Sequence, residues 1–362
     1  MTPKSGSLCL AFAALVVSAA AQTPDPAEAK LLAIRELKAP KFEASKASDD
    51  TYWKDFQTTT RQVIQKRAKL ILEFYTEFPT HKETPNLMEL RWSELEHGSA
   101  EIDPAKAAKA AIEDINAILT KATDPRITMI GKFWRSIYSI RSAVGLKEAI
   151  EAFTAFIADY PAERDRGIML IAQSTSAAAS QDEVIFLYRR IVKDYPDSPQ
   201  AKFYAGVIRQ IESVGKPFGI KFNDLLSGRE VDTSKLKGKV IMIEFYSSTF
   251  SQSAGRLPLL KMLRSELGPK GFEVISICLD IPDTAAGEKQ DQITEVVRGF
   301  VKDNGIAWPV YWPKEVEKDW TLGWGVMSLP SVFIIDKKGN LRYTSEPENI
   351  KGELEKLLKE KG

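Results

Sequence analysis

The chain has very few of the residues that usually carry redox or metal chemistry. Its 362 residues include two cysteines, Cys9 and Cys278, and two histidines, His81 and His97. Two isolated histidines make a poor metal site, because a zinc ion in a protein takes three or four protein ligands. We therefore expect neither a metal ion nor another cofactor.

The sequence also lacks a surplus of charge. Fifty Lys and Arg residues are balanced by 49 Asp and Glu residues, which leaves a formal net charge of +1. Binding to nucleic acid or to an acidic membrane surface rests on an excess of basic side chains. Nucleic acid is therefore not an expected partner.

A short apolar run lies near the N-terminus, from Leu8 to Val17, after Lys4 and before three consecutive alanines that end at Ala21. This order is typical of a secretory signal peptide, and the run is too short to span a bilayer stably. The alternative is a buried N-terminal helix, which the polar segment QTPDPAEAK that follows disfavours. We expect residues 1–21 to be removed, the protein to be exported to the periplasm or beyond the cell, and no integral membrane segment to remain.

Removal of the first 21 residues would take Cys9 away and leave Cys278 alone. Exported proteins reside where disulfides form, but a chain with one cysteine makes no internal disulfide.

After a polar lead-in, residues 22–50, three segments share one pattern. In each, apolar residues recur 3, 4, 7 and 10 positions before an aromatic residue that is followed by a proline. The segments are LILEFYTEFP, EAFTAFIADYP and LYRRIVKDYP, and the aromatic residues are Phe78, Tyr160 and Tyr195. The spacing predicts one buried face of an α-helix in each segment, with the helix ending near the aromatic residue.

The last two of these prolines, Pro161 and Pro196, are 35 residues apart. This distance resembles the period of tetratricopeptide helix pairs, about 34 residues. The other interpretation is an ordinary all-helical domain with a repeated helix-stop signal. Residues 51–214 are predicted to form an all-α domain under either interpretation, and a tetratricopeptide-like domain under the first.

From Gly215 onward, apolar runs alternate with helical patterns. LKGKVIMIEFY and GFEVISICLDI are predicted strands, SLPSVFIID and GNLRYTS are predicted neighbouring strands, and the segments between and after them are predicted helices. This order predicts an α/β domain over residues 215–362, with helices on both faces of its sheet.

The motifs from Lys216 to Gly362 resemble the thioredoxin fold of the exported TlpA/ResA-like (redoxin) thiol-disulfide oxidoreductases. FNDLLSGREVDTSKLKGKV is similar to the hairpin that leads into the family's first core strand, and WGVMSLPSVFIID is similar to its cis-proline segment. The resemblance implies a thioredoxin-like fold and a cis peptide bond before Pro330.

The resemblance also locates the family's Cys-x-x-Cys motif, at the start of the first long helix. The stretch FYSSTFSQSAGRLP, residues 245–258, has Phe250 at the first cysteine position and Ser253 at the second, and it contains no cysteine. Thiol-disulfide exchange needs a thiolate, which neither residue supplies. We therefore predict that this turn has no catalytic residue, and that neither oxidoreductase nor peroxiredoxin chemistry occurs there.

Two further positions match the family. Glu244 stands where the resemblance implies a buried acid beneath the disulfide; alternatively, it is a carboxylate paired with a basic residue such as Arg256, since a buried unpaired acid is costly. Around Pro330, the resemblance implies that Leu329, with Ser328 and Ser331 beside it, offers its backbone groups to an extended peptide. The alternative is that the cis bond serves the fold alone.

Two functions follow. The first is a redox-silent protein that binds or assembles proteins or peptides through both domains. The second is a thiol-disulfide oxidoreductase that uses an unusual thiol, such as Cys278, or a partner's thiol. Cys278 lies within the predicted strand VISICLDI, where a cysteine is usually buried and inert.

Overall fold

The structure is a computed structural model that describes residues 25–46, 49–99, 103–280, 289–313, 322–326 and 328–362. The predicted signal peptide, residues 1–21, lies outside these ranges. The contacts between residues divide the chain into two compact units, Met1–Ser142 and Ala143–Gly362.

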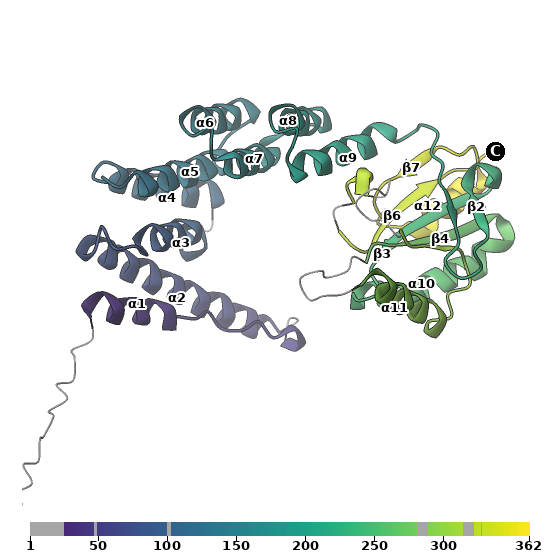
Figure 1. The fold of residues 1–362 in the computed structure, drawn as a ribbon, viewed down its shortest axis with the longest axis horizontal. Coiled ribbons are helices and arrows are strands. Elements are labelled where there is room, and N and C mark those ends of the chain that lie inside the picture. Colours follow the sequence, from purple (N-terminus) through teal and green to yellow (C-terminus); the bar gives the residue numbers. More distant parts are fainter. Residues whose placement is uncertain (1–24, 47–48, 100–102, 281–288, 314–321, 327) are drawn as a thin grey trace, which may run out of the picture. The chain divides into compact units, whose positions relative to one another are not determined.

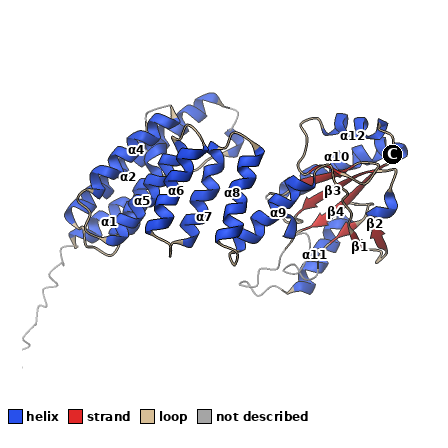
Figure 2. Ribbon diagram, turned by 90° about the horizontal axis from the view of Figure 1, so that it is seen from above, coloured by secondary structure: helices blue, strands red, loops and turns tan. Residues whose placement is uncertain are grey.

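The first unit is helical (Figure 2). Its helices are α1 (Pro26–Glu36), α2 (Asp50–Glu77), α3 (Thr84–Gly98), α4 (Pro104–Leu119) and α5 (Pro125–Arg141), with a 3₁₀ turn at Ala44–Lys46. Four of the helices begin at an aspartate whose side chain accepts a hydrogen bond from the first turn: Asp25, Asp49, Asp103 and Asp124. Such caps satisfy backbone N–H groups that have no partner within the helix. The core of this unit centres on Ile71, Phe74, Met88, Trp92 and Tyr138, which are all fully buried.

The second unit begins with four more helices. These are α6 (Leu146–Asp159), α7 (Arg164–Gln173), α8 (Gln181–Asp194) and α9 (Pro199–Ser213), with a 3₁₀ turn at Ser174–Ala177. The prediction that the N-terminal part of the chain is all-helical is therefore confirmed. Its tetratricopeptide character remains a prediction.

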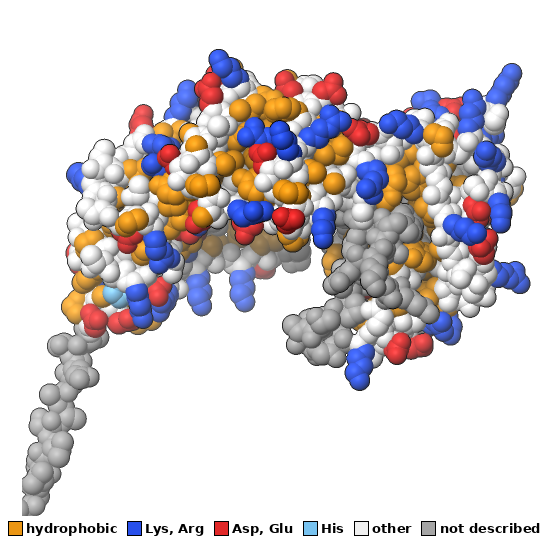
Figure 3. Space-filling model, turned by 45° about the horizontal axis from the view of Figure 1, so that its top comes forward, with side chains coloured by type: hydrophobic (Ala, Val, Ile, Leu, Met, Phe, Trp, Pro, Cys, Tyr) orange, Lys and Arg blue, Asp and Glu red, His pale blue; other side chains and the backbone are white. Residues whose placement is uncertain are grey.

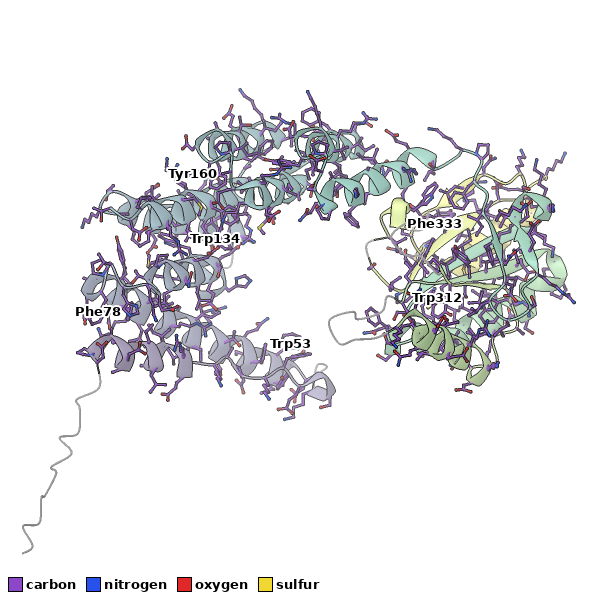
Figure 4. All side chains as sticks on the ribbon, viewed as in Figure 1. Trp53, Phe78, Trp134, Tyr160, Trp312 and Phe333 are labelled. Carbon is purple, nitrogen blue, oxygen red and sulfur yellow. The ribbon has the colours of Figure 1, made fainter. Side chains whose placement is uncertain are left out.

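The three aromatic residues before the prolines end their helices in nearly the same way. Phe78, Tyr160 and Tyr195 have φ of −128°, −132° and −132° and ψ of 57°, 62° and 51°. Each still donates its N–H to the carbonyl four residues back. The proline that follows excludes the α conformation at the aromatic residue, so the helix ends there. Figure 4 labels Phe78 and Tyr160 at these helix ends.

The remainder of the second unit is an α/β domain (Figure 1). A two-stranded antiparallel hairpin, β1 (Lys221–Asn223) and β2 (Glu230–Asp232), precedes a five-stranded sheet. The sheet has the order β5-β4-β3-β6-β7. Its strands are β3 (Val240–Tyr246), β4 (Phe272–Cys278), β5 (Val310–Tyr311), β6 (Ser331–Ile335) and β7 (Leu341–Tyr343), and its helices are α10 (Ser251–Leu267), α11 (Gln290–Asp303) and α12 (Ile350–Lys359). Short 3₁₀ turns lie at Thr233–Leu236, Gly268–Lys270 and Leu322–Trp324.

Strand β3 is the centre of the sheet and is buried along its whole length. It pairs with β4 in parallel and with β6 in antiparallel orientation. The connections β3–α10–β4 and β4–α11–β5 step in the same direction along the sheet, so right-handed crossovers bring α10 and α11 to the same face. Residues of α10, α11 and α12 accordingly share one apolar cluster.

The other face of the sheet is covered differently. There, Phe245 and Phe333 pack with Phe218, with Phe222 of the hairpin and with Trp324. The prediction of helices on both faces is thus wrong for the described part of this domain, because the two parallel crossovers have the same direction. The mixed α/β, thioredoxin-like fold itself is confirmed.

The change from helices to α/β structure falls at the predicted boundary near Gly215, but the contacts place α6–α9 in the same unit as the α/β domain. The independence of residues 51–214 as a folding domain therefore stays a prediction. Within the described ranges, no helix is long and apolar enough to cross a membrane.

Truncation of Phe74 should strongly destabilise the first unit. Its ring is fully buried in the helical core, and a Phe→Ala change in a core typically costs about 3–5 kcal/mol. The matched control is Leu90→Ala on α3, where the side chain is 37% exposed and the expected cost is about 0.5 kcal/mol. Thermal unfolding followed by circular dichroism should show a large downward shift for Phe74→Ala only; equal shifts would contradict this packing.

Candidate functional site

The turn between β3 and α10 places an aromatic ring and a hydroxyl where the resemblance locates the two thiols. Phe250 is the N-cap residue of α10, and its side chain is 49% exposed and makes no capping bond. Ser253, in the first turn of α10, is only 2% exposed. Its Oγ accepts a hydrogen bond of 3.3 Å from the backbone N–H of Ser247. Residue 250 thus faces solvent, whereas residue 253 is part of the packed turn.

A carboxylate that follows the neighbouring strand β4 holds this turn in place. The N–H of Ser248 donates to both oxygens of Asp280, at 3.1 and 3.2 Å, and the Ser248 hydroxyl donates to the same carboxylate. Asp280 is itself buried, and its carbonyl accepts from Trp312 Nε1 at 3.1 Å. Asp280 was not among the predicted site residues. The signal was present, because Asp280 follows a buried strand that runs parallel to β3 and therefore ends at the same edge of the sheet.

Glu244 lies beneath the turn and is only 2% exposed. Its Oε1 is 3.2 Å from Arg256 Nε, and its Oε2 accepts a hydrogen bond of 3.4 Å from the Ser276 hydroxyl. Arg256 also pairs with Glu346. Burial raises the pKa of Glu244 to about 7, although the charge and hydrogen bond of Arg256 oppose the rise. The carboxylate is therefore both buried, as the resemblance implies, and paired with Arg256, as the alternative predicted.

The segment before β6 has the predicted backbone form. The Leu329–Pro330 peptide bond is cis. Ser331 pairs with Phe245 at the end of β3, Ser328 is exposed and Leu329 is half-buried. Among the described residues, no hydrogen bond of the Ser328 or Leu329 backbone is formed.

Cys278 is fully buried beside Tyr246 on the adjacent strand. Burial raises the pKa of its thiol, and the charge of Asp280 adds to the effect. A thiol that is both protonated and inaccessible is a poor nucleophile. His97 is exposed at the end of α3, and His81 packs edge-on against Phe74. No group of three or more potential metal ligands occurs in the parts of the chain that the structure describes.

The surface charge is mixed. Figure 3 shows Lys and Arg side chains interspersed with Asp and Glu over the visible face, in keeping with the balanced composition.

This fold and its cis-proline segment define a thioredoxin-like domain, and comparison with known proteins shows what the domain is similar to. Residues 216–344 match the AhpC/TSA family. The same region is similar in sequence to ResA-like thiol-disulfide oxidoreductases.

Two curated relatives illustrate the similarity. The thiol-disulfide oxidoreductase ResA of Bacillus thuringiensis subsp. konkukian is 29% identical over 134 residues, which are 37% of this chain and 70% of the relative. The thioredoxin-like protein YneN of Bacillus subtilis is 24% identical over 133 residues, 37% of this chain and 71% of the relative. Among solved structures, the thioredoxin domain of a thiol-disulfide oxidoreductase from Bacteroides vulgatus aligns with 40% of this chain and 97% of its own, at 19% identity and a TM-score of 0.33.

The raised pKa of Glu244 predicts a pH-dependent contribution to stability. Because the folded protein holds this proton up to about pH 7, whereas an ordinary Glu releases it near 4.5, the folded state binds more protons between these values. Stability should therefore fall as pH rises through this window, by on the order of 3 kcal/mol in all. Urea unfolding at several pH values should show this fall in the unchanged protein and a flatter profile in Glu244→Gln.

The control is Glu273→Gln, the same substitution on the adjacent strand, where the carboxylate pairs with Lys239 and Arg264. This variant should keep the pH dependence of the unchanged protein. Arg256→Met should move the fall to higher pH, because it removes the cation that lowers the pKa of Glu244. A profile that is identical in all variants would contradict the assignment.

Introduced cysteines should report the geometry of the turn. Residues 250 and 253 are the N-cap and third residue of α10, and the Ser253 N–H lies 3.0 Å from the Phe250 carbonyl oxygen. A disulfide needs Cα atoms within about 4.4–6.8 Å, which one helical turn provides. We expect an internal disulfide to form in air when Phe250→Cys and Ser253→Cys are combined in a Cys278→Ser background. Mass spectrometry should show it as the loss of two hydrogen atoms, about 2 Da. Two persistently free thiols would show that the register is wrong.

Proposed function

We propose that the protein is a redox-silent, thioredoxin-fold module that binds extended protein or peptide segments. Its cis-proline segment pairs with the backbone of the bound chain, and no thiol chemistry takes part. The helical part supplies further protein-binding surface, as is usual for stacked helix pairs.

The observation that carries this proposal is the chemistry of the turn before α10. An exposed phenylalanine and a buried serine occupy positions 250 and 253, and neither side chain forms a thiolate. The helix N-terminus there lowers the pKa of a thiol in an oxidoreductase, but here it has no thiol to act on. Glu244 is likewise engaged by Arg256.

Peptide binding is supported by the segment that contains the cis-proline, residues 328–331. Pairing with an extended chain requires free backbone N–H and C=O groups. It does not require a cysteine. Ser328 and Leu329 offer such groups, and Ser328 is exposed. The exposed ring of Phe250 adds an apolar contact at the start of α10.

We further propose that the protein acts outside the cytoplasm, in the periplasm or beyond the cell. The order of charge, apolar run and small residues in residues 1–21 supports export.

The names of the relatives favour a second function, thiol-disulfide exchange through Cys278 or through a partner's thiol. The burial of Cys278 and the raised pKa of its thiol oppose it. The two functions differ in one measurable property, because an oxidoreductase must turn over a disulfide substrate.

The test combines binding with turnover on the full chain. A fluorescein-labelled, carboxymethylated insulin B chain is an extended peptide without free thiols, and we expect it to bind with a saturable rise in anisotropy. Ser328→Trp should weaken binding about tenfold or more, because a bulky ring blocks backbone pairing. Ser265→Trp, at an exposed serine on α10, is the control and should bind normally.

In the same preparation, insulin reduction with dithiothreitol should not exceed the reagent blank. Turnover that disappears in Cys278→Ser would establish the oxidoreductase instead. Absence of both binding and turnover would overturn the proposed function.

A further inference from the structure

Helix α9 makes an unusually close contact with the segment that leads to the cis-proline. A Cβ atom added at Gly206 would lie 2.4 Å from the Gly325 nitrogen and 2.8 Å from the Trp324 carbonyl carbon. A Cβ added at Gly325 would lie 2.6 Å from the Val207 nitrogen. Real Cβ atoms do not approach backbone so closely, so both positions require glycine. Gly325 also has φ of +57°, which disfavours other residues.

Side chains of α9 also bind the carbonyl groups of this segment. Arg209 Nη1 donates to the Gly323 oxygen at 2.6 Å, and Gln210 Nε2 donates to the Trp324 oxygen. The Arg209 guanidinium lies 5.8 Å from the centre of the Trp324 ring, within the range of a cation–π contact. Residues Gly323–Gly325 are thus held by backbone packing, hydrogen bonds and a ring contact from one helix.

Residues Gly323–Gly325 also contact the residues around Pro330 that are proposed to bind peptide. Trp324 packs edge-on against Phe218 and Phe333, with ring centres 4.8 and 5.8 Å apart. Phe333 belongs to β6, which begins immediately after Pro330, and Leu329 packs into the same apolar cluster. A displacement of Trp324 would therefore disturb the residues on both sides of Pro330.

We propose that α9 is a positioning element for the peptide-binding segment, and that Gly206, Arg209 and Gln210 are the residues through which it acts. This inference rests on the proposed function. It adds that α9, the last helix of the helical part, sets the peptide affinity of the thioredoxin-like domain. The physical reason is pre-organisation. A binding segment that is already held in its bound form loses less conformational entropy when a peptide pairs with it.

The variant Gly206→Ala tests whether α9 acts on the segment Gly323–Gly325 or only maintains its own helix. Within an isolated helix, alanine is more favourable than glycine by about 1 kcal/mol, so α9 itself should not weaken. Against Gly325, however, the added methyl group has no space and must push the segment away. Gly299→Ala in α11 is the matched control, because a Cβ there meets nothing within 4 Å.

Arg209→Ala provides a second variant that keeps the glycine contact and removes the hydrogen bond to Gly323 and the contact with Trp324. Its control is Arg298→Ala on α11, which removes an exposed pair with Glu295 and equally reduces the charge by one. Both Arg variants should fold, since the two side chains are exposed.

Two readouts on the full chain test the proposal. Hydrogen exchange should speed up at Gly323–Val326 and in β6 for Gly206→Ala and Arg209→Ala, with α8 unchanged. Affinity for the labelled, carboxymethylated insulin B chain should fall roughly tenfold in the same variants, within the 5–150-fold range usual for coupled sites, and remain normal in both controls.

The outcomes distinguish the two proposals. Faster exchange with unchanged peptide affinity, or unchanged exchange, would overturn the positioning role and leave the proposed function standing. If the unchanged protein binds no peptide, the proposed function fails and the positioning role fails with it. If Gly206→Ala does not fold, the Arg209→Ala comparison alone decides in the same way.

Discussion

Burial of the Glu244 carboxylate in the central strand is the constraint on which the α/β site depends. A charge in such a position is costly unless it is paired and hydrogen-bonded. Arg256 supplies the pair from the second turn of α10, and its link to Glu346 connects the same guanidinium to the segment before α12. This pairing and the apolar residues that α10 packs against the sheet together hold α10, with Phe250 and Ser253 at its start.

Much of the fold was predictable because local patterns and tertiary packing agree. Buried strands read as continuous apolar runs, and the aromatic residues before Pro79, Pro161 and Pro196 end their helices as expected. The faces of the sheet were not predictable from the order of elements alone. The two-residue strand β5 has no periodicity of its own, yet its place beyond β4 decides that α10 and α11 share a face.

The residues of the site were likewise only partly predictable. Positions 244, 250, 253 and 330 were located through the family resemblance, and they lie on β3, at the start of α10 and just before β6. Asp280 was missed although its place after a buried parallel strand was a usable signal. The contacts of α9 were not predictable, because they join residues distant in the sequence. The Arg209 donor and its Gly323 acceptor are 114 residues apart, and no spacing rule connects an arginine on one helix with a carbonyl so far along the chain.

The absence of a reactive thiol at the turn has a kinetic consequence. A thioredoxin-fold enzyme with two cysteines holds its substrate through a mixed disulfide, and release waits for the second thiol to attack. With Phe250 and Ser253 in those positions, any bound chain would leave by simple dissociation. Its residence time would be set by the contacts that it makes and by temperature, and it would be the same in reducing and in oxidising surroundings.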